Sequence, residues 1–251
     1  MSPGLEVRID ELDGRVYLDS AHEAGPTYVL IHGIGVSHLY LVRLHHQLAE
    51  AGRVLSVDLP GFGGTAKPRH PLSVEDYARF IAQVLEQCGV VRCVLVGHSM
   101  GAQFAIEIAR QHPDLVSHVV LMGPVVDARR TVLQQSLALA RDCLREPPGV
   151  NVIDFVDCLR CGPRFFLAEL GAMLAYPTEE RIGGVVAPVL VVRGAADPVA
   201  KSDWCLALAG RAENGRLLEI HGSRHVVQHS APERVARAIA AFAGAPLPAT
   251  T

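Results

Sequence analysis

The sequence lacks several features that would place it in other classes of protein. No apolar run approaches the roughly 20 residues that a membrane-spanning helix needs. The formal net charge is −3 and no stripe of lysine and arginine is present, so we expect neither a nucleic-acid partner nor a membrane partner. The start of the chain, residues 1–13, is polar and acidic and does not resemble a signal peptide, which favours a cytoplasmic location.

Motifs for a metal or a nucleotide are also missing. The six cysteines are scattered. Cys158 and Cys161 have the spacing of a zinc or redox motif, but no second pair completes a metal site, so we interpret the cysteines as reduced structural thiols. The glycine cluster at residues 61–64 lacks the Lys-Ser/Thr of a phosphate-binding loop. We therefore expect no metal, nucleotide or flavin and no other cofactor.

Strands and helices alternate along most of the chain. Short apolar runs predict strands at residues 27–31, 53–59, 93–96, 116–122, 188–192 and 217–220. Helical patterns cover residues 36–50, 74–88, 100–111, 203–208 and 231–242. Two further runs, 5–9 and 15–20, flank Asp13 and Gly14 and predict a β-hairpin. The whole pattern predicts an α/β fold, with a mainly parallel central sheet flanked by helices.

One helical segment interrupts this alternation. Residues 125–184 contain helical patterns, divided by prolines and glycines, and no convincing strand. They carry more apolar side chains than a single helix at the edge of a sheet needs. We therefore expect a core formed by residues 1–124 and 185–251, with residues 125–184 inserted as a helical cap over the carboxyl edge of the sheet.

The most informative stretch of the chain surrounds Ser99. An apolar strand ends at Gly97, and a helix-forming stretch begins just after the serine. Gly-x-Ser-x-Gly in this context is typical of a nucleophile elbow, a strained turn that lifts a serine hydroxyl above the sheet. Only glycine fits two residues before and two residues after such a serine, which accounts for Gly97 and Gly101. The N-terminus of the following helix favours developing negative charge at the serine.

Five short motifs occur in a characteristic order. They are His32-Gly33, the Asp-Leu-Pro-Gly-Phe-Gly of residues 58–63, the Gly-His-Ser-Met-Gly of residues 97–101, the Gly-Ala-Ala-Asp of residues 194–197 and the Gly-Ser-Arg-His of residues 222–225. On these motifs the chain resembles the α/β-hydrolase fold family over nearly its full length. The family's order of catalytic residues is serine, acid and histidine. The resemblance therefore implies a triad of Ser99, Asp197 and His225, in which the imidazole takes the serine proton and the carboxylate orients the imidazole.

Both partners of the serine have alternatives. Some members of the family place the acid one strand earlier, which makes Asp127 the alternative acid. His221 and His229 compete with His225 for the role of base. Family members commonly carry a proline seven residues after the catalytic histidine, and only His225 has that spacing, to Pro232.

The resemblance also implies an oxyanion hole. Its two donors should be the backbone N–H groups of Met100, directly after the nucleophile, and of Ile34, in the loop after the strand at residues 27–31. His32 and His98 flank the site, and we expect them to brace loops by hydrogen bonding.

A serine nucleophile narrows the reaction. Dehalogenases and epoxide hydrolases of this fold use aspartate there, so the resemblance implies a serine hydrolase that cleaves an ester, a lactone or a thioester. Alternatives are a carbon–carbon bond hydrolase or an assembly-line thioesterase on the same residues, and a ligand receptor without catalysis. Carbon–carbon hydrolases often carry Asn before the serine and Trp after the histidine, where this chain has His98 and Val226.

The expected partner is a small molecule. Large apolar side chains of the cap are the candidates for its pocket, and they suggest a largely apolar substrate. These residues are Phe155, Phe165, Phe166, Met173 and Leu174.

Overall fold

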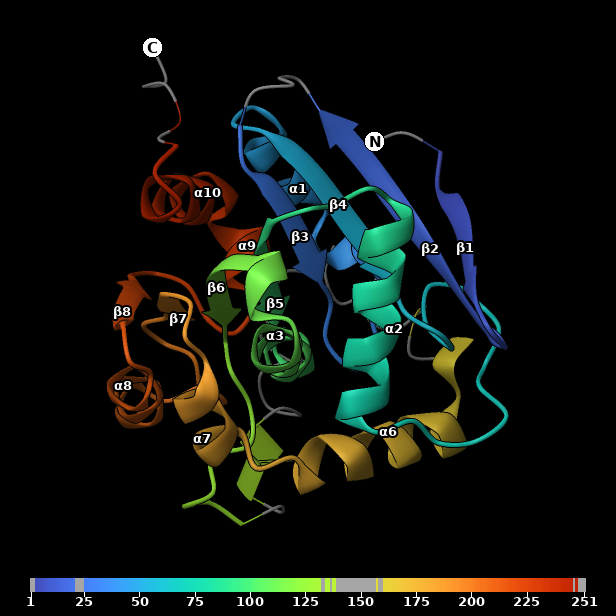
Figure 1. Ribbon diagram of the computed structural model, residues 1–251. Helices are drawn as coiled ribbons and strands as arrows, with labels where there is room; N and C mark the ends of the chain where they lie inside the picture. The colour runs from blue at the N-terminus through green and yellow to red at the C-terminus, as the bar shows by residue number, and fades with distance from the viewer. Residues whose placement is uncertain are drawn as a thin grey trace.

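An eight-stranded sheet forms the centre of the molecule (Figure 1). The computed structural model describes residues 3–20, 25–131, 134–135, 137–138, 157, 160–245 and 247. The strands are β1 (Leu5–Ile9), β2 (Leu12–Ser20), β3 (Thr27–Ile31), β4 (Arg53–Asp58), β5 (Cys93–His98), β6 (Val116–Met122), β7 (Val189–Gly194) and β8 (Gly215–Ile220), in the order β1-β2-β4-β3-β5-β6-β7-β8. β1 with β2 and β2 with β4 pair antiparallel, whereas every pair from β4–β3 to β7–β8 is parallel. The predicted fold class is confirmed.

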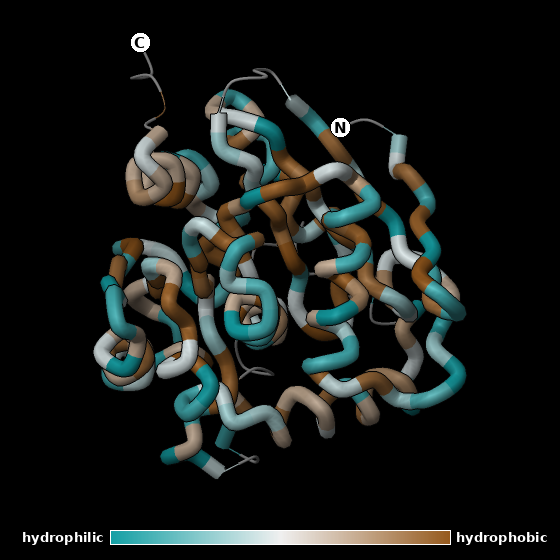
Figure 2. Tube along the Cα trace, viewed as in Figure 1, coloured by the Kyte–Doolittle hydropathy of each residue, from teal (hydrophilic) through white to brown (hydrophobic). Residues whose placement is uncertain are grey.

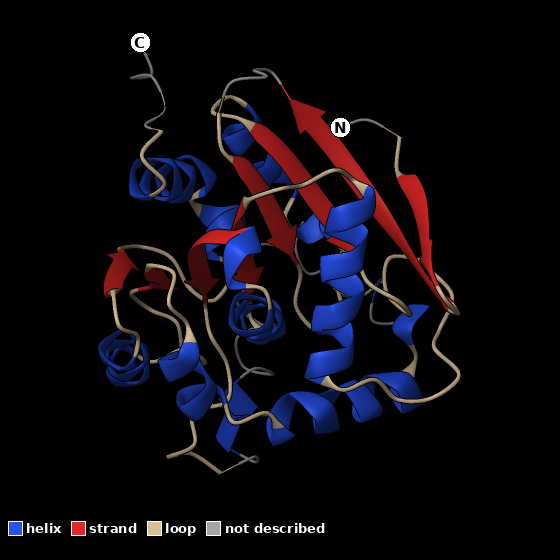
Figure 3. Cartoon of the chain, in the orientation of Figure 1, coloured by secondary structure: helices blue, strands red, loops and turns tan. Residues whose placement is uncertain are grey.

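Helices cover both faces of this sheet (Figure 3). They are α1 (Val42–Ala49), α2 (Val74–Gln87), α3 (Met100–Gln111), α6 (Pro163–Ala175), α7 (Thr178–Arg181), α8 (Ser202–Arg211), α9 (Val227–Ser230) and α10 (Pro232–Phe242), with short 3-10 turns η1 (His38–Tyr40), η2 (Pro113–Leu115) and η3 (Ile182–Gly184). Helices α2, α3 and α8 pack on one face, and α1 and α10 pack on the other. Such two-sided cover is what buries a mainly parallel sheet.

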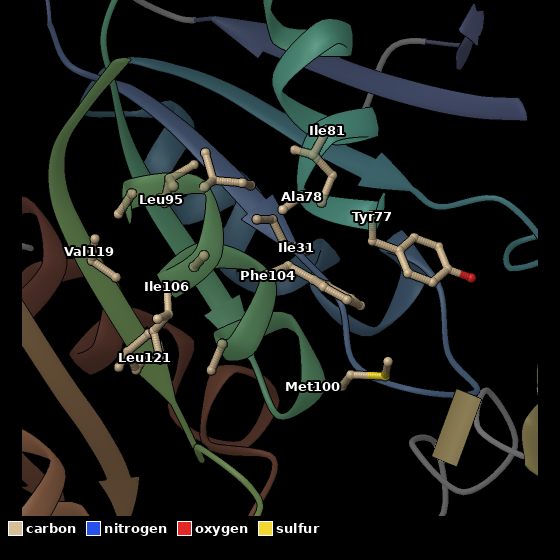
Figure 4. Close-up of a cluster of buried hydrophobic side chains, with 14 of the residues drawn as sticks. Ile31, Tyr77, Ala78, Ile81, Leu95, Met100, Phe104, Ile106, Val119 and Leu121 are labelled. Carbon is tan, nitrogen blue, oxygen red and sulfur yellow. The ribbon is translucent and has the colours of Figure 1, made fainter. Parts of the chain in front are cut away.

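Side chains of the strands therefore belong to two hydrophobic cores, one on each face of the sheet. In β3, Val29 and Ile31 belong to the core beneath α2 and α3, while Tyr28 and Leu30 belong to the core beneath α1 and α10. This follows from the alternation of side chains along a strand. Figure 4 shows part of the first core, and Figure 2 shows that the central strands are apolar along their length. Continuous apolar runs in the sequence thus correspond to strands that are buried on both faces.

Local signals in the sequence set the ends of α2. The Ser73 hydroxyl accepts a hydrogen bond from the Asp76 N–H at 3.1 Å, and the Asp76 carboxylate accepts one from the Ser73 N–H at 3.0 Å. This is a capping box, which satisfies two donors of the first turn. The helix is followed by Gly89, whose φ of 68° is a backbone conformation that favours glycine. Ser73 is therefore the N-cap of α2.

The predicted turn of the N-terminal hairpin is wrong. The turn consists of Asp10 and Glu11, because Ile9 faces Leu12 and Asp10 adopts a φ of 52°. Asp13 and Gly14 lie inside β2. The glycine serves close packing, since a Cβ at Gly14 would lie 2.7 Å from the Cζ of Phe80 on α2.

The predicted helix at residues 36–50 is also not continuous. Ser37 caps the 3-10 turn η1, accepting a hydrogen bond from the Leu39 N–H at 3.4 Å, and α1 begins only at Val42. A serine that bonds to the backbone just ahead favours a turn start over a helix interior. At the other end of the chain, the short helix α9 precedes α10.

Helix α6 crosses the ends of the parallel strands, along the bottom of the view in Figure 1. A Cβ at Gly35, in the loop after β3, would lie 3.0 Å from the Phe166 ring, and one at Gly61, after β4, would lie 2.3 Å from the Phe165 ring. The Gln103 side-chain amide of α3 donates a hydrogen bond to the Met173 carbonyl oxygen at 3.0 Å. α6 thus packs on the loops that follow the strands, where the sequence places the cap; the division into core and cap remains a prediction.

Candidate active site

Ser99 stands at the junction between β5 and α3 in a strained backbone conformation. Its φ of 55° and ψ of −118° lie outside the regions that non-glycine residues ordinarily populate. A Cβ at Gly97 would lie 2.1 Å from the Gly101 carbonyl oxygen, and one at Gly101 would lie 2.3 Å from the Ile31 carbonyl oxygen. Both glycines are therefore required by the close approach of strand and helix.

Two other glycines lie against the reactive side chains. A Cβ at Gly33 would lie 3.0 Å from the Ser99 Cβ and 3.5 Å from its Oγ. A Cβ at Gly123, after β6, would lie 2.9 Å from the Cε1 of His225, and Gly123 also has a φ of 54°. No larger residue fits at either position without moving the serine or the imidazole.

Asp197 and His225 are brought together from the ends of β7 and β8. The carboxylate Oδ2 lies 2.9 Å from the imidazole Nδ1, and both side chains are buried. The carboxylate Oδ1 accepts hydrogen bonds from the N–H groups of Val199 at 2.7 Å and Ala200 at 3.0 Å. Burial alone would raise the pKa of Asp197, but the charge and hydrogen bond of His225 and the two N–H donors outweigh it and lower the pKa. The acid is thus held ionised beside the imidazole.

A buried arginine holds the loop that carries this acid, which we call the acid loop (residues 195–200). Arg193, at the end of β7, is 4% exposed. Its guanidinium donates hydrogen bonds to the carbonyl oxygens of Ala200 at 2.7 Å and of Ala195 and Asp197 at 3.3 Å each. It also forms an ion pair with Glu219 of β8. The sequence analysis did not identify Arg193; the signal was one cation inside an apolar strand.

The N–H groups of Ile34 and Met100 are the predicted donors of the oxyanion hole. Met100 is the first residue of α3, directly after Ser99, and Ile34 lies in the loop next to Gly33. Within the described part of the chain, neither N–H has a hydrogen-bond acceptor. Neither donor is thus taken up by another described group, as the predicted oxyanion hole requires.

Both histidines that flank the site connect loops. The His32 Nδ1–H donates to the Gly33 carbonyl oxygen at 2.7 Å, and its Nε2 accepts from the Leu59 N–H at 3.2 Å. The His98 Nε2–H donates to the His225 carbonyl oxygen at 3.2 Å. Burial lowers the pKa of both, to about 3 for His98, so both rings are neutral. His98, the residue before Ser99, is thereby hydrogen-bonded to the backbone of His225, the candidate base.

The alternative site residues make other contacts. The Asp127 carboxylate is paired with Arg129, whose Nε lies 2.8 Å from its Oδ1. His221 follows β8 directly, where its carbonyl oxygen accepts a hydrogen bond from Arg234. His229 lies on α9, and its carbonyl oxygen accepts a hydrogen bond from Arg43. These contacts place none of the three in the pair that Asp197 and His225 form.

The candidate pocket residues share one helix. Phe165, Phe166, Met173 and Leu174 all lie on α6, where Met173 is buried and the other three are partly buried against the core that contains Met100. Phe155 lies outside the described residues. The described candidates thus form an apolar surface over the loops that carry Gly35 and Gly61.

One acidic side chain interrupts this surface. Glu169 is 0% exposed, and no described residue forms a hydrogen bond with either carboxylate oxygen. The nearby Tyr77 hydroxyl is directed to the Pro60 carbonyl oxygen, 3.3 Å away. Burial raises the pKa of Glu169 to about 7, against a smaller lowering by Tyr77. The sequence analysis missed this residue, because its only signal is one acid in an apolar helix.

A second histidine–aspartate pair lies between β4 and η1. The His38 Nδ1 is 2.8 Å from the Asp58 Oδ2, and the His38 N–H donates to Oδ1 at 2.6 Å. Asp58 is fully buried, and a Cβ at Gly63 would lie 2.2 Å from its Oδ2. The neighbouring Ser37 donates a hydrogen bond to Asp157, at 2.5 Å. These contacts fix the loops after β3 and β4, on which α6 packs.

The described residues contain neither a metal-binding cluster nor a membrane-spanning helix. Among them, no group of three or more His, Cys, Asp or Glu side chains is arranged to hold a metal ion. None of the described helices is long and apolar enough to cross a membrane.

Comparisons with known proteins give the relatives of this chain. It is 25% identical over 240 residues to an (E)-2-((N-methylformamido)methylene)succinate hydrolase of Acinetobacter baylyi, covering 87% of this chain and 90% of that protein. It is 26% identical over 177 residues to a 2-hydroxy-6-oxononadienedioate/2-hydroxy-6-oxononatrienedioate hydrolase of a Pseudomonas species, covering 66% of this chain and 61% of that protein. Matches to plant 1-acylglycerol-3-phosphate O-acyltransferases cover only 26% of those proteins.

A solved structure has the same fold. An enol-lactonase from Burkholderia xenovorans superposes with a TM-score of 0.81 at 20% sequence identity, covering 95% of this chain and 99% of that one. The model of the alpha/beta hydrolase family matches residues 28–238. On this match the chain belongs to the alpha/beta hydrolase family.

Proposed function

We propose that the protein is a serine hydrolase that cleaves an ester, a lactone or a thioester of a small, largely apolar molecule through an acyl-enzyme on Ser99. The observation that carries the proposal is the Asp197–His225 hydrogen bond of 2.9 Å, at the end of the sheet where Ser99 stands. A buried carboxylate on Nδ1 keeps Nε2 unprotonated and stabilises the imidazolium that forms when Nε2 takes a proton. This is the arrangement that activates a serine hydroxyl.

The proposed reaction has two stages. The Ser99 Oγ attacks the substrate carbonyl carbon while the His225 Nε2 takes the hydroxyl proton, and the N–H groups of Ile34 and Met100 stabilise the oxyanion. His225 then gives the proton to the leaving alcohol or thiol, and the acyl-enzyme remains. Water, activated by the same imidazole, attacks the acyl carbon and releases the acid and the free serine.

Two observations support an apolar substrate. The described candidates for the pocket wall, on α6, are aromatic or aliphatic. Among the described residues of that helix the single basic side chain, Arg164, is exposed, whereas the acidic Glu169 is buried. A substrate with free carboxylates would meet no buried cation on the described part of α6 and would be repelled by an ionised Glu169.

A second candidate is hydrolysis of a carbon–carbon bond on the same residues. The observation that favours it is the similarity to the 2-hydroxy-6-oxononadienedioate hydrolase of Pseudomonas. His98 and Val226 stand against it, since carbon–carbon hydrolases of this fold often have Asn and Trp at those positions. The same α6 surface that disfavours carboxylate-bearing substrates disfavours this one, so ester-type cleavage is the first choice.

Pre-steady-state kinetics with p-nitrophenyl esters tests the proposal. A burst of p-nitrophenol equal to the enzyme concentration, with the acyl mass found on a peptide that contains Ser99, is the expected result. Ser99→Ala should show neither the burst nor the added mass. Turnover of a 2-hydroxy-6-oxo diacid without any ester burst would select the second candidate, and binding without turnover would select a receptor.

A further inference from the structure

Glu169 is a buried acid that the proposed mechanism does not use, and unlike the buried Asp58 and Glu107 it forms no hydrogen bond with a described residue. It lies in the middle of α6, on the inward face, with Phe165 and Phe166 one turn before it and Met173 one turn after it. Phe166 packs on Gly35, next to the candidate oxyanion donor Ile34. Gln103, which holds the backbone of Met173, lies one turn into the helix that starts at Ser99.

These contacts bracket the position of the carboxyl. The stretch of α6 from Phe166 to Met173 is about 10 Å long. One end lies on the loop with the candidate oxyanion donor, and the other end lies on the first turns of α3. Glu169 therefore lies between these two ends of the stretch, on the side where Tyr77 of α2 lies near it.

Burial of the Glu169 carboxyl lowers the stability of the fold. A carboxyl that is buried without a well-formed hydrogen bond loses its hydration and gains little in return. Glu169 is fully buried and no described residue has hydrogen-bond geometry to its carboxylate oxygens. The neighbouring Tyr77 hydroxyl donates to the Pro60 carbonyl oxygen at 3.3 Å and lowers the pKa of the carboxyl less than burial raises it. An aliphatic residue would fill an apolar helix face at no such cost, so the carboxyl points to a group that it binds.

We propose that Glu169 binds a hydrogen-bond-donating group, a hydroxyl or an amine, carried by the acyl part of the substrate at a distance from the scissile carbonyl. This inference rests on the proposed function and narrows its substrate class. Phe165, Phe166 and Met173 contact the apolar chain of the substrate, and Glu169 selects the polar group. A site built to pair with a polar group discriminates strongly against the analogue that lacks it.

Matched esters test the assignment. The substrates are p-nitrophenyl esters of a graded series of acyl chain lengths, each with a terminal methyl, methoxy, hydroxyl or ammonium group. The methoxy compound is polar but has no donor. We expect one chain length at which kcat/KM for the hydroxyl or the ammonium ester exceeds that for the methoxy ester by about tenfold or more, since tenfold corresponds to about 1.4 kcal/mol. Which of the two donors is preferred distinguishes an alcohol from an amine.

Substitutions of Glu169 test whether this residue causes the preference for esters that carry a hydrogen-bond donor. Glu169→Leu should abolish the preference for donors and favour the methyl ester, whereas Glu169→Gln should keep part of the hydroxyl preference and lose the ammonium preference. Glu180→Leu, a change of an exposed acid on α7, is the matched control and should keep the wild-type order. Circular dichroism and urea unfolding check that each variant is folded.

The outcomes separate the two proposals. If wild type hydrolyses the methyl esters with an acyl burst but treats hydroxyl and methoxy esters alike at every length, Glu169 is a contact between α6 and α2 and this inference is wrong. A donor preference that survives in Glu169→Leu contradicts it as well. If wild type shows no acyl burst with any ester, the proposed function fails, and the inference fails with it.

Discussion

The amide of Asp197→Asn can take only one orientation without a heavy penalty. In the wild type, Oδ1 accepts hydrogen bonds from the Val199 and Ala200 N–H groups at 2.7 and 3.0 Å, and Oδ2 lies 2.9 Å from the His225 Nδ1. The amide oxygen of asparagine must stay at the two N–H donors, because an NH2 group there would face donors and leave them unsatisfied at about 1–3 kcal/mol each. The NH2 group therefore faces His225.

This orientation reverses the tautomer of the imidazole. Nδ1 of His225 has to accept from the NH2 group, so the proton moves to Nε2, which can then no longer take the proton of Ser99. We expect kcat to fall by about 10³- to 10⁴-fold, which corresponds to about 4–5.5 kcal/mol of transition-state stabilisation, with KM little changed.

Asp127→Asn is the matched control for this variant. It removes the same charge from the alternative acid, which pairs with Arg129. It should leave kcat within about threefold, since Arg129 is half exposed and can be hydrated instead. The assay is p-nitrophenyl ester hydrolysis, with thermal unfolding as the check on folding. A loss of activity in Asp127→Asn together with retention in Asp197→Asn would refute the assignment of the acid.

Three further predictions follow from the same contacts. Arg193→Met removes the guanidinium that holds the acid loop and should lower the free energy of unfolding by about 3–5 kcal/mol in urea, whereas a loss below 1 kcal/mol would contradict its role. Gly33→Ala places a methyl group 3.0 Å from the Ser99 Cβ and should slow acylation by at least about tenfold. Gly171→Ala is the control, because a Cβ there would lie in open space on α6; it should leave acylation unchanged and raise the free energy of unfolding by about 0.5–1 kcal/mol. Burial lowers the pKa of His45 from 6.5 to about 4 and that of His98 from 6.5 to about 3, so the unfolded chain binds protons that the folded chain does not. The stability contributed by these neutral rings is full above pH 6.5, and the free energy of unfolding falls toward pH 4, by about 2 kcal/mol per histidine at pH 5. A free energy of unfolding that is flat over this range would contradict neutral buried rings.

Local patterns explain why much of the fold could be predicted. The capping box at Ser73 and the apolar run of β6 depend on neighbours in sequence, so their elements lie where the sequence indicates. Gly14 misled the prediction of the hairpin turn, because the reason for this glycine is the ring of Phe80, which lies far away in the sequence. The order of motifs indicated that Asp197 and His225 follow adjacent strands; their roles in catalysis remain predictions.

Residues whose roles depend on contacts with distant parts of the chain are hard to identify in the sequence. Arg193 and Glu169 are single charges in apolar segments, and the sequence does not show what such a charge faces. In the fold, one faces the carbonyl groups of the acid loop and the other has no hydrogen-bond partner among the described residues. Both observations need the relative positions of elements that only packing determines. Phe155, a further candidate for the pocket, lies outside the described residues.

Intact-mass analysis after treatment with a fluorophosphonate tests the central claim most directly, because the reagent reacts with an activated serine regardless of the natural substrate. Wild type should gain a single adduct. Ser99→Ala should gain none, and His225→Ala should react far more slowly. Folded wild-type protein that gains no adduct, or an adduct that persists in Ser99→Ala, would contradict the claim that Asp197 and His225 activate Ser99.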